Sequence, residues 1–166
     1  MTRSRRLYHG CAKHLTGIPR VPLFMAVERY AAEWFAGERG DGPGFLHVFI
    51  THFDHPIELT DRTDYLRLIG LARAAGVSIE SDIEQADNWD FYCPDIAQHS
   101  PCDGTNPIDL LYIPAVQTAL LDAGYDSAHL FDTLENTAIE TFVALRPEKV
   151  QLIDTYPVIP APTHPA

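Results

Sequence analysis

Three separated segments of the chain carry residue types that could act together on a substrate. The first has an imidazole beside a glycine, His9-Gly10, and the last has a carboxylate, Glu140, followed by an apolar run. Between them, Phe24 and Phe35 lie eleven residues apart around the start of an expected helix. A carboxylate can stabilise developing positive charge, an imidazole can hold a hydroxyl group, and two aromatic faces can enclose a flat ring. Each residue alone has an ordinary structural explanation, but the order and spacing of the set favour a joint site.

In this order the segments resemble the ADP-ribosyltransferases related to diphtheria toxin and the poly-ADP-ribose polymerases, the branch with a His-Tyr/Phe-Glu site. That family has a Tyr-His-Gly strand, which Tyr8-His9-Gly10 matches, and two ring-stacking aromatic residues, which Phe24 and Phe35 match. Its late glutamate opens a strand followed by Pro-Glu-Gln-Ile. Here the corresponding segments are Glu140-Thr141-Phe142-Val143 and Pro147-Glu148-Lys149-Val150. The resemblance covers most of residues 7–153 in islands.

The resemblance implies a mono-ADP-ribosyltransferase that cleaves NAD⁺ at the nicotinamide–ribose bond and transfers ADP-ribose to a macromolecular acceptor. NAD⁺ is then a substrate, and no metal is implied. Glu140 is the implied catalytic carboxylate, and His9 is the implied catalytic partner that holds a ribose hydroxyl. The implied NAD⁺-contacting residues are His9, Gly10, Phe24, Ala32 and Phe35. The backbone of Gly10 is implied to reach the carboxamide because no Cβ blocks the approach.

Several positions depart from the family pattern. Phe24 and Phe35 replace tyrosines, which keeps the aromatic face and removes a hydroxyl. Cys11 follows the His-Gly pair where Ser or Thr is usual, and Ala32 stands near the place of a serine that anchors the carboxamide. Ala138 lies two residues before the late glutamate, where arginine-directed relatives have a second acidic residue. An arginine acceptor is therefore disfavoured.

The family resemblance also implies partners. Short stand-alone domains of this type often act as toxins, in toxin–antitoxin pairs or in phage conflict, so an antitoxin protein is a candidate partner. The formal net charge of −11 repels a phosphate backbone and so favours a protein acceptor over a nucleic acid. By analogy, 132–137 is the loop that meets the acceptor. Two alternatives stay open: an NAD⁺ glycohydrolase that uses water, and a catalytically inactive module that binds a nucleotide or a protein.

Two other chemistries have candidate residues. His52 and His55, with Cys93 or Cys102, are residue types that zinc uses. At a strand end, however, two residues three apart point to opposite faces, so a non-metal role is favoured. Cys11 beside neighbouring histidines suggests a nucleophilic thiol. No third group to orient it is identifiable, and a buried cysteine is commonly just a small apolar residue.

The strands and helices predicted along the chain together indicate a mixed α+β domain. The resemblance implies the ADP-ribosyltransferase fold, two small facing β-sheets with flanking helices around an NAD⁺ cleft. Residue patterns predict strands at 6–11, 22–26, 45–53 continued by 56–59, 125–131, 137–145 and 149–153, and helices at 27–36, 63–75 and 108–123. Thr60-Asp61 and Gly124 are expected helix boundaries. Residues 79–89 fit either a helix or irregular structure, and 91–107 form an expected loop. Residues 1–153 are one expected domain, and 154–166 a proline-rich tail.

Composition agrees with such a domain. A chain of 166 residues can bury a core, and 46% hydrophobic with 21% charged residues argues against wholesale disorder. Three cysteines leave at least one unpaired, which favours a reducing compartment. No apolar run approaches the roughly 18 residues of a membrane span. We therefore expect a soluble cytoplasmic protein without a membrane partner.

Overall fold

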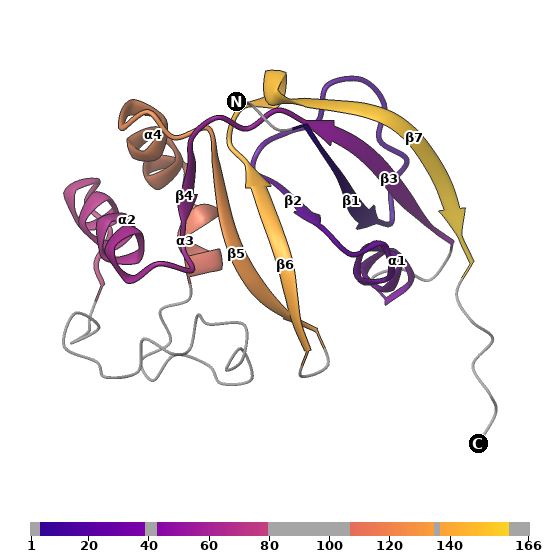
Figure 1. Ribbon diagram of the computed structural model, residues 1–166, viewed down its shortest axis with the longest axis horizontal. Helices are drawn as coiled ribbons and strands as arrows, with labels where there is room; N and C mark the ends of the chain where they lie inside the picture. The colour runs from indigo at the N-terminus through magenta and orange to yellow at the C-terminus, as the bar shows by residue number, and fades with distance from the viewer. Residues whose placement is uncertain (1–3, 39–42, 80–106, 135–136, 160–166) are drawn as a thin grey trace.

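In the described part of the chain, seven strands form one sheet with the order β4-β5-β6-β2-β1-β3-β7 (Figure 1). The computed structural model describes residues 4–38, 43–79, 107–134 and 137–159. The strands are β1 Arg5–Cys11, β2 Leu23–Ala26, β3 Gly44–Thr51, β4 Pro56–Glu58, β5 Ser127–Leu134, β6 Thr137–Ala144 and β7 Val150–Val158. β4 and β5 pair in parallel, whereas the other neighbours pair antiparallel. With its helices, this sheet confirms the α+β class.

The sheet has two halves that meet at one point. β1 pairs with β3 from Arg5 to Cys11, and β2 pairs with β6 from Leu23 to Ala26. Between the halves, β1 and β2 share a single register pair, Tyr8 with Ala26. The two expected sheets are thus joined through this pair into one strand order, and the ADP-ribosyltransferase fold itself stays a prediction. On either side of it, β1 and β2 are not paired.

The helices cover one face of the sheet. They are α1 Arg29–Glu38, α2 Arg62–Ala74, α3 Pro107–Leu111 and α4 Pro114–Asp122. α1 lies against β1 and β3, whereas α2, α3 and α4 share an apolar core with β4, β5 and β6 (Figure 1). The opposite face has a core of its own, built around Leu7, Met25, Phe49 and Phe142. No helix among the described residues is both long and apolar enough to cross a membrane.

α1 lies so close to the strands that it requires glycines beneath it. A Cβ on Gly10 would lie 1.7 Å from the carbonyl oxygen of Ala32, and one on Gly44 would lie 1.9 Å from that of Ala36. Both separations are far below van der Waals contact. Ala32 and Ala36 are almost fully buried for the same reason. Two strand glycines therefore set the depth at which α1 sits on the sheet.

Local signals predicted the ends of α2 correctly. The Asp61 carboxylate caps this helix by accepting the backbone N–H groups of Thr63 at 2.8 Å and Asp64 at 3.3 Å. Gly76 follows the helix at φ 86°, and Gly124 follows α4 at φ 93°. Both glycines take the left-handed conformation that ends helices, as their positions predicted.

The expected single helix at 108–123 is wrong, because two short helices occupy this stretch. α3 ends at Leu111, and α4 begins at Pro114. Proline lacks the N–H that would continue a helix, and it disfavours helical geometry in the residue before it. Accordingly, Ile113 is extended, with φ −82° and ψ 118°. The break leaves Tyr112 exposed between the two helices.

Two strands are longer than expected. β5 continues to Leu134, so Asp132 lies in a strand and not in an acceptor-facing loop. β7 continues to Val158, opposite Gly44 on β3, past the expected domain end at residue 153. Most of the segments 79–89 and 91–107 lies outside the described residues, and so does the tail from residue 160 onward.

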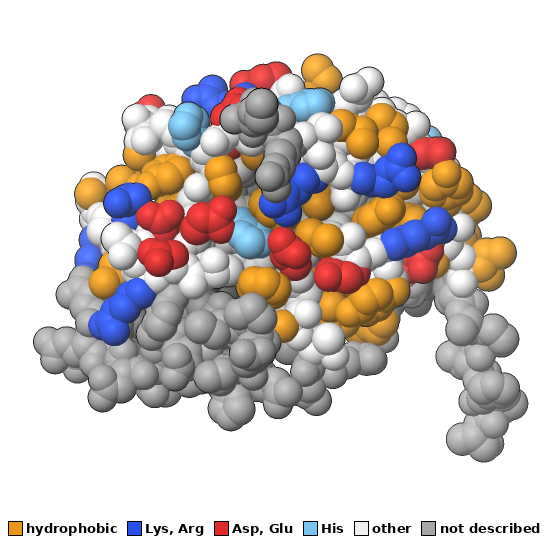
Figure 2. All heavy atoms as spheres, in the orientation of Figure 1, with side chains coloured by type: hydrophobic (Ala, Val, Ile, Leu, Met, Phe, Trp, Pro, Cys, Tyr) orange, Lys and Arg blue, Asp and Glu red, His pale blue; other side chains and the backbone are white. Residues whose placement is uncertain are grey.

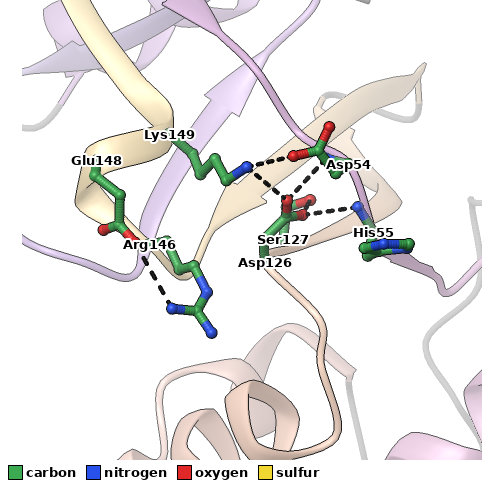
Figure 3. A network of polar contacts seen from close by, with 7 residues as sticks. All are labelled: Asp54, His55, Asp126, Ser127, Arg146, Glu148 and Lys149. Carbon is green, nitrogen blue, oxygen red and sulfur yellow. Dashed lines mark hydrogen bonds and ion pairs between the residues drawn. The ribbon is translucent and has the colours of Figure 1, made fainter. Parts of the chain in front are cut away.

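A buried carboxylate ties three connections together (Figure 3). Asp126 is 4% exposed, and it accepts the backbone N–H groups of Asp54 at 2.8 Å and His55 at 3.3 Å and the hydroxyl of Ser127 at 2.9 Å. Lys149 binds the carboxylate of Asp54 and lies 3.8 Å from that of Asp126. This network anchors the turn between β3 and β4 to the start of β5 and the approach to β7.

The substitution Gly44→Ala tests the depth of α1. The added methyl group must displace the Ala36 carbonyl, so we expect the free energy of unfolding to fall by about 1–3 kcal/mol. Gly70→Ala is the matched control, because a Cβ there meets nothing within 4 Å inside α2. Alanine favours a helix, so this control should gain about 0.5–1 kcal/mol. Urea unfolding measures both, and equal stabilities of the two variants would contradict the packing.

Candidate functional site

A cleft of about 420 Å³ lies on the helix-covered face of the sheet, between α1 and α3. Its floor comes from β1, β2, β5 and β6, one wall from α1, and the other from α3 with Tyr112. The volume falls within the range of small-molecule sites. The cleft therefore occupies the region where the two halves of the sheet separate.

All five residues that the sequence predicted to contact NAD⁺ line this cleft. They are His9, Gly10, Phe24, Ala32 and Phe35. They come from β1, β2 and α1, so folding brings together the first two of the three predicted segments. The third segment is represented by Thr141 and not by Glu140.

The alternation of side chains along strands explains this selection. Ala26 on β2 and Thr141 on β6 are register partners, and both line the cleft. Phe24 is two residues before Ala26 and shares its face. The side chains of Met25 and Phe142, which are also register partners, belong to the core on the opposite face. One face of β2 and β6 thus forms the floor, and the other face is structural.

Aromatic rings stand at both walls of the cleft. Phe24 stacks on Tyr112, with ring centroids 4.8 Å apart and an interplanar angle of 20°. Phe35, on α1, makes an edge contact with Trp34 at 5.2 Å. Sequence analysis missed Tyr112 because it lay inside the expected helix at 108–123. The signal that could have found it is Pro114, because a proline there separates α3, which ends at Leu111, from α4 and places Tyr112 in the connection between them.

The His9 imidazole bridges β1 and β2 where the ladder between them is absent. Its Nδ1 lies 2.7 Å from the carbonyl oxygen of Phe24. Burial lowers the pKa of His9 below its ordinary value, an effect that the hydrogen bond to Phe24 opposes and nearby His47 reinforces. The ring is therefore neutral at pH 7. Because a carbonyl can only accept, Nδ1 carries the proton and Nε2 is left as an acceptor.

A second buried histidine supports the first. The ring of His47 lies beside that of His9, with centroids 6.3 Å apart. His47 is fully buried, its Nε2 donates to the carbonyl of Lys13 at 3.1 Å, and its Nδ1 lies 3.1 Å from the hydroxyl of Thr155. Burial also lowers the pKa of His47, and the proximity of His14 adds to that effect. Neutral histidines thus connect the loop after β1 to β7.

Gly10 lines the cleft, but its missing Cβ serves another purpose than expected. The space that a Cβ would fill is taken by the backbone of Ala32 and Ala36. The glycine is therefore required for packing α1 against β1. An approach of the Gly10 backbone to a ligand carboxamide stays a prediction.

Glu140 lies on the face of β6 opposite to the cleft. It is the register partner of Phe131 and alternates with Thr141, whose side chain faces the cleft. Its carboxylate lies 3.1 Å from Nε2 of His129 and 3.5 Å from the guanidinium of Arg5. The structure thus separates Glu140 from the five cleft residues, which corrects the expected grouping. Acidic, basic and histidine side chains lie close together on the face of the molecule shown in Figure 2.

Two carboxylates that sequence analysis did not select line the cleft. They are Asp132 on β5 and Asp109 on α3. Asp132 is partly buried, whereas Asp109 is exposed. Strand periodicity could have indicated Asp132, because it shares a face with the buried Leu130 and Leu134. Its placement in an expected loop concealed that signal.

The structure does not support the two alternative sites, a zinc site and a nucleophilic cysteine. Within the described residues, no group of three His, Cys, Asp or Glu side chains could hold a metal ion. His52 and His55 are both exposed, and Cys93 and Cys102 lie outside the described residues. The Cys11 thiol donates to the carbonyl of Lys13 at 3.0 Å, and burial raises its pKa. A raised pKa lowers the thiolate fraction, which disfavours a nucleophilic role.

No family model matches the chain, and no curated protein matches it. Two solved structures are similar to it. One is an anti-CRISPR protein, 20% identical with a TM-score of 0.46, over 90% of this chain and 96% of that chain. The other is a chain of the M. tuberculosis MbcT–MbcA toxin–antitoxin complex, 15% identical with a TM-score of 0.45, over 96% of this chain and 86% of that one. At this degree of similarity, a function has to follow from the cleft itself.

The buried histidines predict that acid destabilises the protein. Because the pKa values of His9 and His47 are lowered in the folded state, below pH 6.5 the unfolded chain binds protons that the folded chain refuses. Stability is therefore complete above that pH and falls as the pH decreases through it. Urea unfolding at a series of pH values should show this decline, and His47→Gln should weaken it. A wild-type stability that stays constant between about pH 7.5 and pH 5.5 would contradict the assignment.

Proposed function

We propose that this chain has the ADP-ribosyltransferase fold and is an NAD⁺-consuming enzyme that transfers one ADP-ribose to a macromolecular acceptor. One observation carries the proposal: the segments that resemble the first two motifs of that family meet in a single cleft. His9 and Gly10 come from β1, Phe24 from β2, and Ala32 and Phe35 from α1. These residues lie far apart in the sequence and line one cleft of ligand size.

The cleft suits the nicotinamide end of NAD⁺. Phe24 and Phe35 line the cleft from β2 and α1, and Tyr112 stacks on one face of Phe24. A flat ring gains about 0.5–1.5 kcal/mol per aromatic pair beyond its area burial. In this arrangement nicotinamide lies between Phe24 and Phe35. His9, whose Nδ1 donates to the Phe24 carbonyl, borders the same cleft beside the ring of Phe24.

The reaction is a substitution at the anomeric carbon of the nicotinamide ribose. NAD⁺ and an acceptor X–H give ADP-ribosyl–X, nicotinamide and one proton. The ribose passes through an oxocarbenium-like state whose positive charge a nearby carboxylate stabilises. The net charge of −11 favours a protein acceptor over a nucleic acid. A role as a toxin, with a neutralising antitoxin, or in phage conflict fits an enzyme that consumes NAD⁺.

Incubation with adenine-labelled NAD⁺, alone and with cell lysate, tests the activity. We expect nicotinamide release and label on a macromolecular fraction that protease removes. Nicotinamide release without a labelled macromolecule would identify a glycohydrolase instead. If the protein neither binds nor cleaves NAD⁺, the proposal is wrong and a binding module for another ligand remains.

The substitution Phe24→Ala tests the aromatic wall. Loss of the ring removes a stacking surface, so the KM for NAD⁺ should rise about tenfold, which corresponds to roughly 1.4 kcal/mol. Phe24→Tyr keeps the aromatic face and should retain the wild-type KM. Tyr30→Ala is a control on α1, because Tyr30 is exposed and does not line the cleft. An unchanged KM in Phe24→Ala would remove Phe24 from the NAD⁺ site.

A further inference from the structure

The cleft needs a carboxylate if it is to stabilise an oxocarbenium-like ribose, and the register of β5 and β6 determines which acid of these strands faces it. Asp132 on β5 is opposite Ile139 on β6, and Leu130 is opposite Thr141. Residues that are opposite each other project to the same face, and so do residues two apart on one strand. Asp132 therefore projects to the face of Thr141, and both line the cleft.

Glu140 projects the other way. Its register partner is Phe131, the neighbour of Asp132, so the two acids lie on adjacent strands with opposite orientations. The Glu140 carboxylate is also engaged by His129 at 3.1 Å and by Arg5 at 3.5 Å. In turn, His129 lies 2.5 Å from Glu58 on β4. These contacts make Glu140 part of a charge network that links β1, β4, β5 and β6.

We infer that Asp132, and not Glu140, is the catalytic carboxylate that contacts the nicotinamide ribose, an inference that rests on the proposed function. The position of Asp132 on a paired strand supports this inference. Its backbone is already fixed by the pairing, so little entropy is lost when the side chain contacts a substrate. β5 is paired with β6 from Ser127 to Leu134. Asp109, the other acid of the cleft, is exposed and belongs to a five-residue helix.

The surroundings of Asp132 strengthen its effect on a developing charge. The buried Leu134 and Ile139 flank it on β5 and β6, and they pack with Ala31 and Trp34 of α1. An apolar surrounding lowers the local dielectric, which makes a carboxylate–cation interaction stronger than in water. Asp132 is thus a partly buried carboxylate beside the apolar packing between α1 and the two strands.

The step that Asp132 assists is balanced without any additional reagent. The bond between the anomeric carbon and the nicotinamide nitrogen breaks, and its electron pair leaves with nicotinamide. The acceptor nucleophile supplies the electron pair of the new bond to the anomeric carbon, and its proton passes to solvent. The Asp132 carboxylate faces the positive ribose in between and is unchanged at the end.

Asp132→Asn and Glu140→Gln form the decisive pair, because each removes one charge with little change of shape. We expect Asp132→Asn to lower the kcat of nicotinamide release about a hundredfold or more, as loss of one transition-state contact does. Its NAD⁺ affinity, measured by calorimetry, should stay near that of the wild type. Glu140→Gln should keep the wild-type kcat. Asp132→Glu retains the charge and should recover part of the lost rate.

Each outcome separates the inference from the proposed function. Wild-type turnover in Asp132→Asn, or a large loss of kcat in a folded Glu140→Gln protein, overturns the assignment of Asp132 and leaves NAD⁺ cleavage intact. Absence of nicotinamide release by the wild-type protein overturns both. Circular dichroism verifies that each variant is folded. If Asp132→Asn fails to fold, Asp132→Glu and Glu140→Gln still decide between the two acids.

Discussion

β1 and β2 meet only at Tyr8 and Ala26, and the geometry of the cleft depends on where they separate. A continuous ladder would bring the two strands to the spacing of a closed sheet, about 4.8 Å, and would use the carbonyl of Phe24 in a backbone hydrogen bond. Instead, Nδ1 of His9 donates a hydrogen bond to that carbonyl at 2.7 Å. A side chain thereby satisfies a backbone group that would otherwise lack a partner on that side, and the two halves of the sheet can diverge around a ligand-sized space.

In the same region, residues that line the cleft also contribute to the packing of the fold. Gly10 lets α1 approach β1 closely, and this approach brings Ala32 and Phe35 to the wall of the cleft. His9 is buried beside His47, so it stays neutral and can offer Nε2 as an acceptor. The cost is sensitivity to acid, because buried imidazoles resist protonation only at the expense of folding stability. His9, which lines the cleft, and His47 beside it therefore also affect the stability of the fold.

The two acids of β5 and β6 illustrate the effect of strand periodicity. Asp132 and Glu140 lie on neighbouring paired strands, yet their side chains emerge on opposite faces of the sheet. A shift of one residue in either strand would move the acid of that strand to the other face of the sheet. Glu140 consequently belongs to a network with Arg5 and His129, whereas Asp132 faces the cleft. Resemblance of a motif to a family locates the strand, but it does not determine the face.

The sequence by itself determined the α+β class, most strands, the capping of α2 by Asp61 and the helix-ending glycines, because these features depend on residues close together in the chain. Its resemblance to a known family also pointed to five residues that line the cleft. Only the tertiary structure decided the single sheet, the depth of α1 and which carboxylates line the cleft. The single sheet and the faces of the acids depend on the pairing and register of strands far apart in the sequence. The depth of α1 depends on its close contact with two strand glycines. No local sequence pattern determines these features.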